Sequence, residues 1–145
     1  LDITQVNVYT SSASDPWSST TSRDTLLGEL RNHWNGSGRI EQSRHHVHLL
    51  SGRNTGGGVA YLNTLGSAQK QYAYGVSGNI EGSFSPSNPK VVWDAVVIAH
   101  EIGHAFGSDH THNYDNPYLG SNQGGAIDCC YSEESGQCVV QLGGT

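Results

Sequence analysis

One helical stretch places the tightest limit on how this chain folds. Residues 89–106 present apolar side chains on nearly every side of a helix, yet the stretch also carries His100, Glu101 and His104. A helix that is apolar all round is expected in the middle of a domain. Buried histidine and glutamate side chains need partners that offset their loss of water. The stretch therefore predicts a buried helix that ends in a polar site.

The spacing of these polar residues indicates a metal site. His100 and His104 are four residues apart, so they share one face of the predicted helix. Gly107 is expected to end the helix, because glycine readily adopts the left-handed conformation after a last turn. His110 follows three residues later and can return to the same ion. Three histidines leave a fourth position open for water, as catalytic zinc sites do.

Glu101 is expected to act as a general base in this site. It lies beside His100, where it reaches a metal-activated water instead of the metal. A bare HExxH pattern is common by chance, but the longer pattern HExxHxxGxxH is complete in residues 100–110. Its glycine also falls where the helix is predicted to end.

Length and charge exclude several other classes of protein. The chain has 145 residues, which suits one domain, and a net charge of −6 without a Lys/Arg cluster. A nucleic-acid binder needs a basic face, so we expect no nucleic-acid partner. The longest apolar stretch, residues 91–99, is much shorter than the roughly 20 residues that span a bilayer. We expect no membrane span.

The remaining elements are predicted from periodicity. A helix is expected after the N-cap Ser22, with Leu26, Leu27, Leu30 and Trp34 on one side and a stop at Gly36. Strands are expected at residues 3–9, 44–50, 59–62 and 73–80.

The motif resembles a known signature. HEIGHAFGSDH at residues 100–110 is similar to the zinc signature of the metzincin metallopeptidases. The order of elements around Gly-Gly-Val-Ala-Tyr-Leu-Asn at 57–63 resembles the reprolysin (adamalysin-like) branch over most of residues 1–110. The resemblance implies an α+β, zincin-like catalytic domain: a twisted mixed β-sheet packed on helices, including a central zinc-binding helix. It also implies a zinc endopeptidase with ligands His100, His104 and His110 and base Glu101.

The same resemblance implies how a substrate binds. A peptide or protein would lie along an exposed sheet edge and pair with it as an added strand, with Gly58, Val59 and Ala60 as the expected pairing residues. An ordinary strand after a Gly-rich turn remains the alternative for these residues. We further expect a secreted, monomeric protein. A zinc-loaded but inactive peptide-binding module, an inactive truncated fragment and a zinc hydrolase acting on non-peptides remain the alternative functions.

Two departures from the metzincin pattern concern the C-terminal part. The residue after the third histidine is Thr111, where reprolysin-like enzymes commonly have Asp, and the chain contains no methionine. Metzincins carry a methionine turn beneath the zinc. We therefore expect residues 1–145 to be a catalytic domain that lacks its Met-turn at the C-terminus, with truncation at the N-terminus left open.

The sequence leaves open the disulfide pairing of the three cysteines and the roles of several histidine and aspartate residues. Neighbouring Cys129 and Cys130 rarely bond to each other, so a disulfide from Cys138 to either one is expected. His46 and His48 share a strand face, and we interpret them as surface or half-buried polar residues, with a second metal site as the alternative. Calcium is a less favoured cofactor, since the oxygen-bearing residues of the tail lack EF-hand spacing. These residues are Asp109, Asp115 and Asp128.

Overall fold

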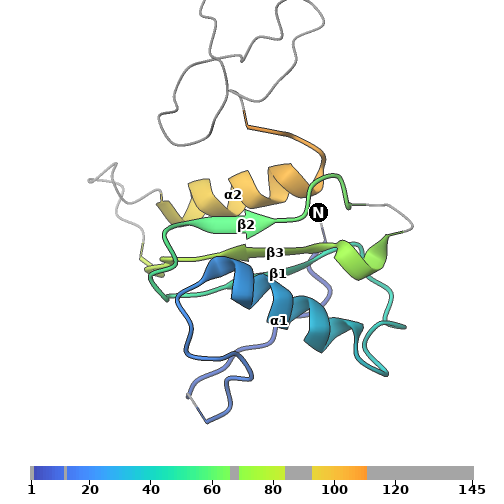
Figure 1. Cartoon of the computed structure of the whole chain (residues 1–145), viewed down its shortest axis with the longest axis horizontal. Helices are drawn as coiled ribbons and strands as arrows, with labels where there is room; N and C mark the ends of the chain where they lie inside the picture. The colour runs from blue at the N-terminus through green and yellow to red at the C-terminus, as the bar shows by residue number, and fades with distance from the viewer. Residues whose placement is uncertain (1, 12, 66–68, 84–92, 111–145) are drawn as a thin grey trace, which may run out of the picture. The chain divides into compact units, whose positions relative to one another are not determined.

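The computed structural model describes residues 2–11, 13–65, 69–83 and 93–110. Leu1–Gly107 form one compact unit, and Ser108–Thr145 form a second, of which only residues 108–110 are described. The described part of the first unit is an α+β fold with two α-helices, a short 3₁₀ helix at Lys70–Tyr72 and a three-stranded mixed sheet (Figure 1). None of its helices has the length and apolar character needed to cross a membrane.

The order of the strands in the sheet places β2 at an edge. Its strands are β1 (Val47–Leu50), β2 (Gly58–Ala60) and β3 (Tyr74–Ser77), in the order β1-β3-β2. β1 runs parallel to β3, and β2 runs antiparallel to β3. The expected mixed sheet is confirmed, and among the strands of the described residues β2 has a neighbour on one side only (Figure 1).

Helix α1 (Arg23–Asn35) begins and ends where the sequence indicates. The Ser22 side chain accepts a hydrogen bond from the Thr25 N–H at 3.3 Å, which satisfies one of the unpaired donors of the first turn. Gly36 is the residue that follows the last turn. The N-cap and the stop are thus confirmed.

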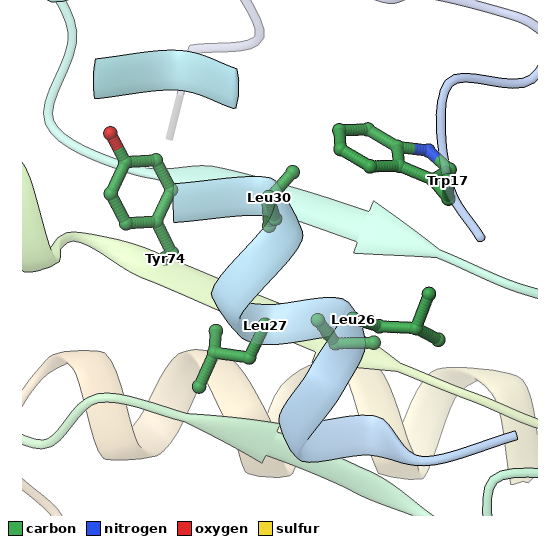
Figure 2. Packing of buried hydrophobic residues seen from close by; sticks show 6 residues of the cluster. Trp17, Leu26, Leu27, Leu30 and Tyr74 are labelled. Atoms are coloured by element: carbon green, nitrogen blue, oxygen red, sulfur yellow. The ribbon is translucent and has the colours of Figure 1, made fainter. Parts of the chain in front are cut away.

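One face of α1 builds the main core against the sheet. Leu26 and Leu30 are almost completely buried, and they pack with Tyr74 and Val76 of β3 and with Trp17 (Figure 2). Half-buried apolar side chains surround this cluster, namely Trp34, Val47, Leu49, Val59 and Tyr61. Because side chains alternate along a strand, Val47 and Leu49 of β1 face α1 together with Tyr74 and Val76 of β3. His48, Leu50, Gly75 and Ser77 face the other way, and Leu50 is exposed.

Helix α2 (Trp93–Ala105) packs on the opposite face of the sheet from α1 (Figure 1). Val97, Glu101 and Ala105 are its buried residues, spaced by one turn. The expectation of a helix buried on all sides is wrong for the described residues, since Val96 is 53% exposed. The reason is that α2 covers the sheet with a single stripe of side chains.

Three strand predictions also differ from the structure. Residues 3–9 form no strand, and Ile3, Val6 and Val8 are more than two-thirds exposed. Alternating β-branched residues favour extended backbone, but a strand also needs a neighbouring strand for its hydrogen bonds. The second and fourth predicted strands are shorter than expected, at four residues each. The cysteines, Thr111, Asp115 and Asp128 lie outside the described residues.

Candidate functional site

The histidine-bearing end of α2 is held by the segment that follows β2. Asn63 N–H donates to the His104 carbonyl at 2.8 Å, and the N–H groups of Thr64 and Leu65 donate to the Ala105 carbonyl. These bonds satisfy carbonyls that a helix end leaves unpaired. Gly107 follows with φ +95°, which confirms the predicted glycine stop. The end of α2 and the continuation of the edge strand are thereby fixed to each other.

The structure brings together the three histidines predicted as ligands. His100 Nε2 and His104 Nε2 are 3.0 Å apart, with ring planes at 85°. One ring nitrogen from each of His100, His104 and His110 lies within 4.8 Å of the others. His104 and His110 are half-buried and His100 is exposed, so solvent reaches the group. The backbone N–H of His110 donates to Asp109 Oδ1 at 2.8 Å.

Glu101 turns from this group toward the edge strand. Its side chain is 3% exposed, and its Oε2 has no hydrogen-bond partner. A Cβ atom added at Gly58 would lie 2.6 Å from both Cγ and Oε1 of Glu101. The carboxylate therefore occupies the space that any larger residue at position 58 would fill. A buried carboxylate oxygen without a partner is rare in a folded protein and marks a place where function is worth testing.

The environment of Glu101 shifts its acidity. Burial raises the pKa of the Glu101 carboxyl to about 7, because removal from water disfavours the charged form. The Arg23 guanidinium acts in the opposite direction and lowers the pKa. Arg23 Nη1 lies 3.4 Å from the Gly56 carbonyl, just before β2, so an α1 residue and an α2 residue interact electrostatically across a glycine-rich segment.

Only some backbone N–H and C=O groups of β2 point toward its free edge. Tyr61 N–H donates to the Tyr74 carbonyl, and Gly78 N–H donates to the Gly57 carbonyl. Backbone groups in an antiparallel pair alternate in direction, so the groups of Val59 also point to β3. The N–H and C=O groups of Gly58 and Ala60 point away from the sheet.

Sequence reasoning missed two features of this site. The sequence indicates Gly58 as a residue that pairs with substrate, but not that Gly58 makes room for the Glu101 side chain. Arg23 gave no signal, because its effect on Glu101 depends on two helices that lie on opposite faces of one sheet. Only the three consecutive glycines could have indicated a close approach of another element.

The sequence matches a reprolysin model of metallo-peptidase family M12 over residues 1–141. The chain belongs to this family. It is thus a reprolysin-like metzincin, and the family assignment predicted from the zinc signature is confirmed. The comparison with curated proteins found no match.

Family M12 members are typically zinc-dependent peptidases, and the donor set of this M12 chain fits that ion. Imidazole nitrogen is a preferred zinc ligand, and three histidines are one of the ligand sets of catalytic zinc sites. The close approach of the His100 and His104 nitrogens is compatible with one shared ion. No acidic side chain is part of the group of ligand atoms in the described residues.

Proposed function

We propose that the chain is a zinc-dependent endopeptidase in which Glu101 is the general base. Membership of a metallopeptidase family supports peptide-bond hydrolysis as the reaction class. The observation that carries the assignment of the general base is the position of Glu101. It is a buried carboxylate with an unpartnered oxygen, one residue from His100 and directly beside the edge strand. No other described carboxylate combines these features.

In this proposal His100, His104 and His110 hold the zinc ion. When bound, zinc supplies Lewis-acid activation of water and of the scissile carbonyl. Glu101 accepts the proton of the attacking water on a carboxylate oxygen and delivers it to the leaving amine. Burial of Glu101 between α2 and β2 keeps this carboxylate in one orientation, which lowers the cost of positioning it in the transition state.

The substrate would bind as an additional strand beside β2. Gly58 and Ala60 supply the pairing groups, because their N–H and C=O point outward, while Val59 keeps its backbone on β3. Val59 contributes by packing its side chain against the core beneath α1, which holds β2 on the sheet. Such pairing recognises the backbone of an extended peptide, and so favours unfolded protein segments as substrates.

The test is cleavage of casein by the zinc-loaded wild type and by Glu101→Gln, with zinc content measured in both. Glu41→Gln, an exposed change outside the site, is the matched control. We expect Glu101→Gln to retain zinc and lose about 10²- to 10⁴-fold in activity, the usual range for a general base. The control should cleave like the wild type.

The alternative functions appear as other outcomes of the same assay. Zinc binding without cleavage in any variant would indicate a peptide-binding module or an inactive fragment. Cleavage of a small ester but not of casein would indicate a non-peptide hydrolase. Equal casein cleavage by wild type and Glu101→Gln would remove Glu101 from the mechanism.

A further inference from the structure

A second pair of histidines lies on the sheet, apart from the α2 site. His48 belongs to β1, and His46 comes just before this strand. Val47 and Leu49 pack toward α1, so His46 and His48 share the other face. Both side chains are half-buried, which leaves solvent a path to them. The proposed peptidase function makes no use of either residue.

The geometry of this pair matches that of two ligands on one ion. His46 Nε2 and His48 Nδ1 are 3.2 Å apart, and the ring planes are tilted by 43°. Two nitrogens bound tetrahedrally to zinc at the usual bond length are about 3.3 Å from each other. The separation resembles the 3.0 Å between His100 and His104.

The neighbouring strand holds the His48 ring in this orientation. His48 Nε2 lies 2.8 Å from Ser77 Oγ, and Ser77 is completely buried. A metal-binding histidine usually forms a hydrogen bond to a polar group through the ring nitrogen that does not bind the metal, and this bond orients the ring. Opposite His48 on β3 is Gly75, where an added Cβ would lie 2.9 Å from His48 Nδ1. A glycine is thus required for the ring to lie against β3.

The electrostatic environment keeps both rings neutral. Burial lowers the pKa of His46 to about 4, and burial followed by the charge of His46 lowers the pKa of His48 to about 4. At neutral pH each ring therefore has a lone pair that no proton occupies. His46 Nδ1 is buried without a hydrogen-bond partner, so the present contacts do not satisfy this ring.

We propose that His46 Nε2 and His48 Nδ1 bind a second divalent transition-metal ion such as Zn²⁺, with Ser77 orienting His48. Two imidazoles suit zinc, copper or nickel, and exclude the oxygen-seeking ions calcium and magnesium. Water would complete the coordination. With two protein ligands in place of three, this site binds more weakly than the α2 site.

The experiment is a calorimetric titration of Zn²⁺ into the full chain, already loaded with one equivalent of zinc and with its three cysteines alkylated. The wild type should bind one further ion. His46→Gln and His48→Gln should weaken this second event about tenfold or more. His45→Gln, which changes an exposed neighbour, is the matched control and should behave like the wild type.

Two more variants separate the second site from folding and from the α2 site. Gly75→Ala keeps both histidines but displaces the His48 ring, so it should also weaken the second event. The double variant His100→Gln/His104→Gln should keep the His46/His48 event and lose the other, whatever the outcome for the peptidase function. Circular dichroism checks that each variant is folded. A second event that survives in both His46→Gln and His48→Gln, or its absence in the wild type, would overturn the proposal.

Discussion

The two histidine pairs of this protein have similar local geometry and different surroundings. His100 and His104 approach to 3.0 Å on a helix, and His46 and His48 approach to 3.2 Å at a strand. Beside the helical pair are a third histidine and the buried Glu101, next to an open strand edge. Beside the strand pair is the hydroxyl of Ser77. We propose that each pair binds a metal ion, but only the helical pair also has the carboxylate and the strand edge that the proposed hydrolysis needs.

The largest expected difference between the two regions is in catalysis. His104→Gln should reduce casein cleavage at least about 10³-fold, because loss of the zinc ion removes several kcal/mol of transition-state stabilisation. The exposed His45→Gln should leave cleavage unchanged. Measuring kcat/KM for both variants checks this, and a near-normal rate for His104→Gln would contradict the assignment of the catalytic ion to α2.

Gly58→Ala tests whether the open strand edge depends on the glycine. The added Cβ would lie 2.6 Å from the Glu101 side chain and from the Val76 carbonyl, which is backbone and does not move aside easily. We expect a loss of about 1–3 kcal/mol in the free energy of unfolding, the usual cost of overpacking, and a fall in kcat.

Gly28→Ala in α1 is the matched control for Gly58→Ala, since its Cβ would meet no atom within 4 Å. It should stabilise the helix by about 0.5–1 kcal/mol. Urea denaturation and casein kinetics on both variants decide the matter. A Gly58→Ala protein as stable and active as wild type would show that Glu101 does not need this space.

The strand pair should make stability depend on pH. The folded-state pKa values of His46 and His48 are about 4, below the ordinary value of 6.5. Between pH 4 and pH 6.5 the unfolded chain therefore binds more protons than the folded protein does. The contribution of the two neutral histidines to the free energy of unfolding is fully present above pH 6.5. It falls as the pH drops toward 4, by about 1–2 kcal/mol per histidine at pH 5.

Urea denaturation at pH 7.5 and pH 5, with a chelator present, measures this loss. The double variant His46→Gln/His48→Gln should be less sensitive to acid than wild type, whereas His45→Gln should be as sensitive. Equal sensitivity in all three proteins would mean that other groups cause the acid effect.

The smallest expected effect comes from the start of α1, which lies far from both pairs in sequence. Ser22→Ala removes the side chain that accepts from the Thr25 N–H. The expected loss is about 1 kcal/mol in the free energy of unfolding, with no change in zinc stoichiometry. Denaturation and metal analysis test this. Loss of a zinc ion in this variant would show that the metal sites depend on the stability of α1 and not only on the residues around each histidine pair.

Features that depend on short spacing could be predicted from the order of residues alone. The Ser22 cap and the glycine stop at Gly107 follow from residues within one or two turns of each other, and the zinc signature lies within residues 100–110. The proximity of His100, His104 and His110 likewise follows from intervals of four and six residues. Local backbone geometry sets all of these, so the pattern of residue types was sufficient.

Features that join distant segments became apparent only in the folded chain. The contact of Gly58 with Glu101, the influence of Arg23 on that carboxylate and the bond from His48 to Ser77 link residues that are about 30 or more positions apart. The exposed residues 3–9 and the one-sided burial of α2 also depended on which neighbours were present. Strand pairing and burial are properties of the assembled sheet, and no local pattern specifies the partner.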